Sequence, residues 1–99
     1  MVARISRFEG VNVGEVRRTA AEVDSVLRPL VEALAGYQAM HAYLSEAGEM
    51  IVVYEFDSEA NARAAETTFD QTMPDKLGHL FSTWAGRRVS AGLFGTLDG

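Results

Sequence analysis

The residues of this chain best suited to chemistry are one histidine and a set of aromatic side chains. His41 is one of only two histidines, and a neutral imidazole can take a proton from a phenolic compound near neutral pH. Aromatic rings nearby can stack on a flat ligand and direct its oxygens by hydrogen bonds; the candidates are Tyr37, Tyr43, Tyr54 and Phe56. The same residues can equally fill an interface between two protein molecules. The pattern therefore allows a catalytic and a structural interpretation.

An arginine and a tryptophan are the other candidates for ligand binding. If Ile5 points toward the helices, Arg4 falls on the opposite face of its strand. A guanidinium buried there needs a carboxylate or an anionic ligand to offset its desolvation, and Glu55 or a position at the rim would satisfy it without a ligand. Trp84 follows the spacing of a core-facing helix, with a place at a pocket mouth as the alternative.

Several classes of enzyme are disfavoured by what the sequence lacks. It contains no cysteine, and its histidines and acids do not form a recognised metal-binding spacing. There is no Ser-His-Asp set, no glycine-rich phosphate loop and no HExxH motif. We therefore expect neither a metal nor another cofactor, and hydrolase, kinase and metalloenzyme functions are disfavoured.

Length and composition indicate one globular domain. The chain has 99 residues, of which 47% are hydrophobic and 23% charged, so we expect a single domain over residues 1–99. Its net charge of -5, with scattered arginines, makes nucleic acid an unexpected partner. No apolar stretch is long enough for a signal peptide or a membrane span. We expect a cytoplasmic protein with no membrane association.

The apolar pattern predicts four strands and two helical regions. The strands are expected over residues 2–8, 37–44, 50–56 and 87–97. The first helix should begin at Asn12, with Glu15 completing a variant capping signal, kink near Pro29 and end at Gly36. The second should begin at Ser58 and break at Pro74, followed by a short helix that ends near residue 86.

This order of elements predicts an α+β fold. Strand, helix, strand, strand, helix, strand with right-handed crossovers gives the ferredoxin-like βαββαβ arrangement, an antiparallel sheet with both helices on one face. The chain is too short to cover the second face of that sheet by itself.

The central hairpin determines which residues share a face. A four-residue loop over residues 46–49 would pair Ser45 with Met50 and place His41 opposite Tyr54. One face would then hold Tyr37, His41, Tyr43, Val52, Tyr54 and Phe56, and the other would hold Met40, Ala42, Leu44, Ile51, Val53 and Glu55. A loop one residue longer or shorter would mix the two sets. The aliphatic set suits the helices, so we expect the aromatic set to face away from them.

An exposed aromatic face of this size exceeds what monomers usually tolerate. We therefore expect a homodimer formed through the sheet face, with a cavity for a small aromatic ligand where the two sheets meet.

The chain resembles the dimeric α/β-barrel superfamily, and within it the antibiotic biosynthesis monooxygenase-like (ABM) proteins, over nearly its whole length. The resemblance rests on the element order and on residues 27–30 (Leu-Arg-Pro-Leu), 36–39 (Gly-Tyr-Gln-Ala) and 54–59 (Tyr-Glu-Phe-Asp-Ser-Glu). It implies a dimeric α/β barrel. The family includes cofactor-independent monooxygenases of quinols and polyphenols, haem-degrading enzymes, and members without a known activity. The resemblance therefore implies that one of these roles applies here.

The haem-degrading branch of this family fits the chain poorly. That branch uses an Asn on the first strand, a Trp at the end of the third strand and a His on the later helix. Here the first strand offers Ser6 and Arg7, the Trp position corresponds to Phe56, and His79 lies too far along the chain. Haem degradation is therefore disfavoured.

The sequence is compatible with two functions, and a third is less favoured. The first is a cofactor-independent monooxygenase acting on a small aromatic or quinol-like compound, with His41 as the base and Tyr54 and Tyr43 orienting the substrate. The second is a non-catalytic module that binds a small hydrophobic ligand or only dimerises. Haem binding is the third.

Overall fold

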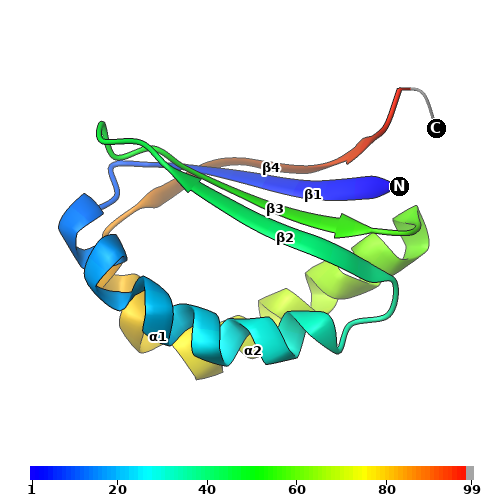
Figure 1. Cartoon of the computed structure of the whole chain (residues 1–99), viewed down its shortest axis with the longest axis horizontal. Coiled ribbons are helices and arrows are strands. Elements are labelled where there is room, and N and C mark those ends of the chain that lie inside the picture. Colours follow the sequence, from blue (N-terminus) through cyan, green and yellow to red (C-terminus); the bar gives the residue numbers. More distant parts are fainter. Residues whose placement is uncertain (98–99) are drawn as a thin grey trace.

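The chain forms a four-stranded sheet covered on one face by two helices (Figure 1). The computed structural model describes residues 1–97. The elements are β1 (Val2–Glu9), α1 (Val13–Glu32), β2 (Tyr37–Leu44), β3 (Met50–Phe56), α2 (Glu59–Trp84) and β4 (Arg87–Gly95). The strands are antiparallel in the order β2-β3-β1-β4. The predicted ferredoxin-like βαββαβ fold is thereby confirmed.

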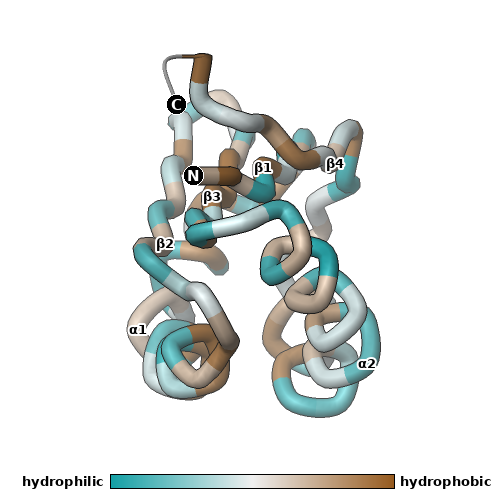
Figure 2. Tube along the Cα trace, turned by 90° about the vertical axis from the view of Figure 1, so that its right-hand side faces the viewer, coloured by the Kyte–Doolittle hydropathy of each residue, from teal (hydrophilic) through white to brown (hydrophobic). Residues whose placement is uncertain are grey.

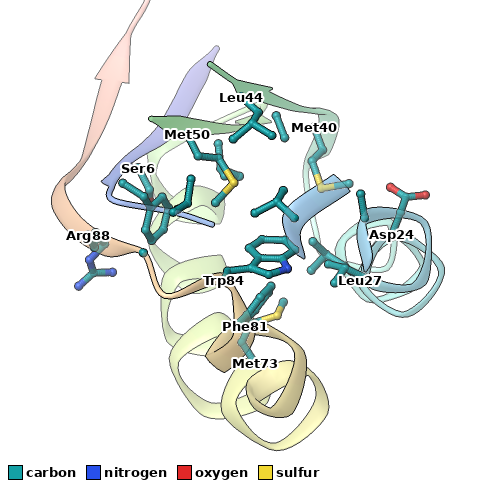
Figure 3. Close-up of a pocket in the computed structure, with 18 of the residues that line it drawn as sticks. Ser6, Asp24, Leu27, Met40, Leu44, Met50, Met73, Phe81, Trp84 and Arg88 are labelled. Carbon is teal, nitrogen blue, oxygen red and sulfur yellow. The ribbon is translucent and has the colours of Figure 1, made fainter. Parts of the chain in front are cut away.

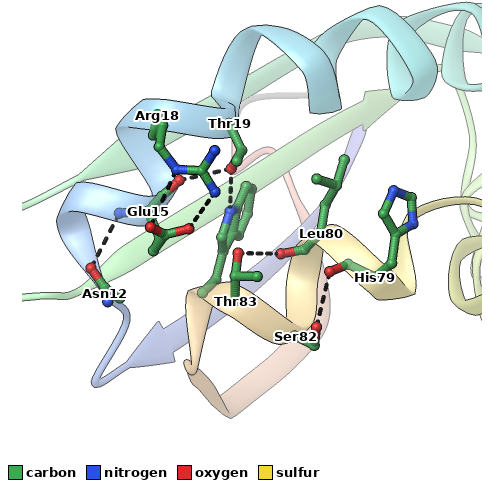
Figure 4. Close-up of polar contacts among 9 residues, drawn as sticks. Asn12, Glu15, Arg18, Thr19, His79, Leu80, Ser82 and Thr83 are labelled. Atoms are coloured by element: carbon green, nitrogen blue, oxygen red, sulfur yellow. Dashed lines mark hydrogen bonds and ion pairs between the residues drawn. The ribbon is translucent and has the colours of Figure 1, made fainter.

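Both helices begin at the predicted caps. The Asn12 side chain accepts a hydrogen bond from the backbone N–H of Glu15 at 3.1 Å, drawn in Figure 4. Ser58 accepts one from the N–H of Asn61 at 3.2 Å. Each bond satisfies a donor that the first helical turn leaves without a partner.

Neither helix breaks at its proline. Pro29 lies inside α1, which continues to Glu32, and Pro74 lies inside α2, a single helix of 26 residues. The predicted break at Pro74 and the separate short helix after it are therefore wrong. Both halves of α2 bury apolar side chains, with Phe69 before the proline and Leu77 after it in the same core cluster. This packing offsets the hydrogen bond that a helical proline removes.

The central hairpin has a five-residue loop, so the predicted register is wrong by one residue. Leu44 pairs with Met50, and His41 lies opposite Val53 rather than Tyr54. Ser45 belongs to the loop, where its N–H donates to the carbonyl of Glu49 at 2.8 Å. A shift of one residue moves one strand's side chains to the other face relative to its neighbour.

The corrected register changes which side chains face the helices. Tyr54, Phe56, Val52 and Arg4, all predicted to face away from the helices, lie on the helix side, and Ile51 and Val53 face away instead. Tyr54 is flanked by Met40 on β2 and Arg4 on β1 in one row across the sheet. That row lies on the buried side, since Tyr54 is 8% and Arg4 9% exposed. Alternation then gives the other face, which we call the outer face, the residues Ala3, Ile5, Arg7, Ala39, His41, Tyr43, Ile51, Val53, Glu55, Ser90, Gly92 and Phe94.

The hydrophobic core lies between the sheet and the two helices, which run side by side beneath it (Figure 2). Its most deeply buried large side chains are Phe56, Leu77 and Val31, one from β3 and one from each helix. No helix within residues 1–97 combines the length and the apolar character needed to cross a membrane.

Candidate functional site

A cavity of about 790 Å³ lies between the helix side of the sheet and the two helices. It is therefore formed within a single chain, whereas the sequence led us to expect the cavity between two sheets. Its wall is mainly apolar and aromatic, and Figure 3 shows Trp84 between Phe81 of α2 and the sheet residues Leu44 and Met50. Three methionines contribute to the wall, Met40, Met50 and Met73. Such a wall suits a flat apolar ligand, because thioether and aromatic groups pack well against rings.

Trp84 lines the cavity and connects the two helices by a hydrogen bond. Its indole Nε1–H donates to the Thr19 hydroxyl at 2.7 Å, and that hydroxyl donates to the carbonyl of Glu15 at 2.7 Å. Figure 4 shows Thr19 on α1 above the end of α2, with Glu15 also paired to Arg18. Thr19 is buried, so the chain of bonds satisfies polar groups that water does not reach. The sequence placed Trp84 in the core or at a pocket, and it lines this cavity.

Arg4 supplies a buried positive charge at the cavity wall. Its Nη1–H donates to Ser6 Oγ at 3.3 Å, and its guanidinium carbon lies 5.4 Å from the centre of the Phe69 ring. Its Nε lies 3.6 Å from Glu66 Oε1 on α2, yet it has no hydrogen-bond partner among residues 1–97. A buried donor without an acceptor is uncommon in native structures and calls for an explanation.

Tyr54 lies opposite Arg4 on the neighbouring strand, and both residues line the cavity. Burial raises the pKa of Tyr54 to about 12, because desolvation disfavours the phenolate, and the positive charge of Arg4 offsets only part of that effect. The ring packs on Phe69 with 4.7 Å between centroids. Tyr54 is therefore a neutral phenol at physiological pH, able to donate a hydrogen bond to a ligand.

His41 does not lie with these residues. It belongs to the outer face, where its side chain is 50% exposed, stacks on Tyr43 and lies 3.8 Å from a carboxylate oxygen of Glu55. Tyr43 is also mainly exposed, although it borders the cavity at its strand. The sheet thus separates the predicted base from Arg4 and Tyr54.

The remaining predicted site residues belong to the core. Phe56 is fully buried, and Tyr37, opposite it across a bulge in β2, packs on the same core cluster. The structure thus brings Arg4, Tyr54 and Trp84 to one cavity and leaves the other four candidates at its edge or outside it. Sequence reasoning missed Ser6 and Phe69. The signal for Ser6 was its position two residues after Arg4, on the same face of a strand.

The described residues offer no ready metal site. Within residues 1–97, no three carboxylate or imidazole side chains gather closely enough to hold a metal ion. The polar groups that a ligand would meet inside the cavity are Arg4, Ser6 and Tyr54, whereas the other charged residues of the lining are exposed: Arg17, Asp24, Arg28, Asp70 and Arg88.

Comparison with known proteins identifies the fold. No protein-family model matches the chain, and no curated protein is similar to it in sequence. Among solved structures, it is similar to a "putative antibiotic biosynthesis monooxygenase" of Bordetella bronchiseptica (15% identity, TM-score 0.70, 97% of this chain and 96% of that chain covered). It is also similar to a dimeric ferredoxin-like protein from an uncultured marine organism (12%, 0.73, 97% and 94%) and to Rv0793 of Mycobacterium tuberculosis (19%, 0.64, 99% and 96%). At these identities the likeness establishes the fold, and the resemblance to ABM proteins is confirmed at that level.

Proposed function

We propose that the cavity is the active site of a cofactor-independent monooxygenase that acts on a small aromatic or quinol-like compound. The observation that carries the proposal is Arg4, a buried cation at the wall of a mainly apolar cavity, whose one side-chain hydrogen bond among residues 1–97 is from Nη1 to Ser6. Two solved structures with the same fold, described as a "putative antibiotic biosynthesis monooxygenase" and a "putative monooxygenase", add support for this activity. The substrate would bind between the sheet and the helices of one chain, and not between two sheets as expected from the sequence.

A guanidinium at this position would act on the substrate's acidity. A phenol whose oxygen lies against Arg4 loses its proton more readily, because the phenolate gains a charge-assisted hydrogen bond in a poorly solvated site. The electron-rich anion can then reduce O₂. The phenol and O₂ give a quinone and water: one oxygen atom replaces the hydrogen of a ring carbon, and the other leaves as water with the two hydrogens of the substrate. The substrate supplies all the electrons, so no cofactor is needed.

In this proposal His41 is not the base. It lies on the outer face, so the proton of the substrate passes to solvent or buffer while Arg4 holds the anion. Tyr54, neutral at physiological pH, donates a hydrogen bond to the substrate oxygens.

Oxygen uptake with a panel of hydroquinones and naphthols tests the proposal. Wild type should consume O₂ above the uncatalysed rate, and Arg4→Gln should lower kcat/KM by about 10- to 100-fold, the usual effect of losing a hydrogen bond to a charged group. Arg7→Gln, on the outer face, and His41→Ala should retain wild-type rates. No uptake by wild type with any member of the panel, or full activity of Arg4→Gln, would refute the monooxygenase.

Binding of a small hydrophobic ligand without turnover is the second candidate. Turnover would be helped by a buried base, and the carboxylates that border the cavity do not supply one. Asp24 and Asp70 are both exposed, and Asp24 is paired with Arg28 at 3.0 Å. Calorimetric binding of a naphthol by wild type, together with no O₂ uptake, would select this candidate over the first.

The proposal includes a homodimer formed through the outer face. That face presents apolar side chains on every strand, and Phe94 is 56% exposed. Such an apolar surface is more often an interface than a solvated face. A similar structure is described as a dimeric ferredoxin-like protein. A cytoplasmic location remains a prediction from the sequence.

A further inference from the structure

We infer that Glu66 is an exchangeable counter-ion of Arg4, which makes the cavity selective for flat aromatic monoanions, carboxylates or phenolates, over neutral rings of the same shape. The inference rests on the proposed function in one respect, because it concerns the same cavity. It does not require turnover.

The first observation is that Arg4 is held loosely for a buried arginine. A guanidinium carries several N–H donors, and among residues 1–97 only Nη1 has an acceptor, Ser6 at 3.3 Å. Glu66 lies 3.6 Å from Nε, too far for a hydrogen bond, and Nε is without a partner. Nε is itself shielded from solvent, so a ligand would meet the terminal N–H groups of Arg4, which lines a cavity large enough for a ligand.

The second observation is that the two members of the pair are unequally buried. The Arg4 side chain is 11% exposed and that of Glu66 is 35% exposed. Arg4 extends from the central strand β1 and packs on Phe69, whereas Glu66 lies on α2 with its side chain partly exposed. Glu66 can therefore turn to solvent at little cost, but Arg4 cannot follow it. The buried cation then needs another anion.

These two observations define the selectivity. In the empty cavity Glu66 compensates the charge of Arg4 from the helix side. An anion that reaches the free guanidinium donors gains charge-assisted bonds, and it competes with Glu66 for the same charge. A neutral ligand of equal shape gains no such bond and does not compete. Glu66 therefore weakens the binding of anions while keeping the empty site electrically compensated.

Calorimetric titration near neutral pH with 2-naphthoate and with 2-naphthamide, its uncharged analogue, tests the inference. Wild type should bind the naphthoate more tightly. Glu66→Gln should tighten naphthoate binding by about 2- to 5-fold, the range expected for a partly exposed ion pair, and leave the amide within 2-fold of wild type. Arg4→Gln should weaken naphthoate binding by about 10- to 100-fold with little effect on the amide.

Two further variants separate charge from structure. Glu59→Gln makes the same change of net charge at the start of α2, away from Arg4, and should leave both affinities unchanged. Arg4→Lys keeps the charge and should retain most of the preference for naphthoate, which guards against an unfolded Arg4→Gln. Circular dichroism checks the fold of each variant.

Several results would overturn the inference: no binding of naphthoate by wild type, equal affinity for both ligands, or a Glu66→Gln variant that binds naphthoate no more tightly than wild type does. Its failure is distinguishable from failure of the proposed function. If oxygen uptake persists but Glu66→Gln leaves naphthoate binding unchanged, only the counter-ion role of Glu66 is refuted. If naphthoate binding depends on Glu66 but no oxygen is consumed, only the monooxygenase activity is refuted.

Discussion

Burial changes the chemistry of individual side chains in this protein, and Tyr54 illustrates the effect. Its pKa is raised to about 12 by desolvation, against an ordinary value of 10.0. The folded state holds the phenolic proton of Tyr54 more tightly than the unfolded state does. The contribution of this proton to the free energy of unfolding is therefore present in full only below the pKa of the unfolded chain. The stability contributed in this way is lost as pH rises from 10 toward 12.

Replacing this tyrosine by phenylalanine should reduce that alkaline loss of stability. The free energy of unfolding of wild type should fall by about 1.4 kcal/mol per pH unit across the window because of Tyr54, and Tyr54→Phe should lack this component. Urea unfolding at several pH values from 9 upward measures it. Tyr43→Phe, which removes a hydroxyl from the exposed outer face, is the matched control. An equal alkaline loss in Tyr54→Phe and wild type would contradict the assignment.

At the scale of elements, α2 shows tertiary packing prevailing over a local signal. The helix runs through Pro74, whose ring removes the backbone donor that would otherwise bond to the carbonyl of Asp70. Apolar residues on both sides of the proline bury against the sheet and α1, among them Ala65, Phe69, Leu77 and Leu80. A break at the proline would expose one of these two groups.

Pro74→Ala should therefore stabilise the protein. Restoring the missing donor should raise the free energy of unfolding by about 1 to 3 kcal/mol, less than the full cost of a helical proline, because the unfolded chain also gains freedom. Urea denaturation provides the measurement. Asp75→Ala changes helix propensity at the next, exposed position and should contribute only about 0.5 kcal/mol. If Pro74→Ala is no more stable than wild type, the backbone around Pro74 cannot form the added bond.

At the scale of the whole molecule, the sheet has apolar side chains on both faces, and the two helices cover one of these faces. Both helices lie on one face of the sheet (Figure 1), the side of Arg4 and Tyr54, so neither helix covers Ile5, Ile51 and Val53 on the outer face. A second copy placed on the outer face would bury them. It would also bury the pair of His41 and Glu55, which gives this histidine an interface role in the proposal.

Val53→Asp tests the dimer directly. Val53 lies on a central strand and faces outward, so a carboxylate there would be desolvated in the interface without a partner. Sedimentation velocity should show wild type as a dimer and Val53→Asp as a folded monomer. Ala64→Asp, on the exposed surface of α2, should remain dimeric. A monomeric wild type, or a dimeric Val53→Asp, would exclude the outer face as the interface.

The order of the elements and their caps could be predicted from the sequence, because these depend on neighbours along the chain. Asn12 and Ser58 accept hydrogen bonds from the N–H groups three residues later, and β2 and β3 have the predicted bounds, residues 37–44 and 50–56. Arg4, Tyr54 and Trp84 were also recognisable as candidates from their chemistry alone. This local information is sufficient for the ferredoxin-like fold.

Which candidates share a site was decided only by the tertiary structure. The register depends on a single residue of loop length, and the loop is held by a contact from elsewhere in the chain, since the N–H of Val11 donates to the carbonyl of Gly48 at 3.0 Å. That one residue moves Tyr54 to the helices and separates it from His41, because side chains alternate across a strand. The sequence by itself thus determined the elements and the candidate groups, and the tertiary structure determined on which side of the sheet they meet.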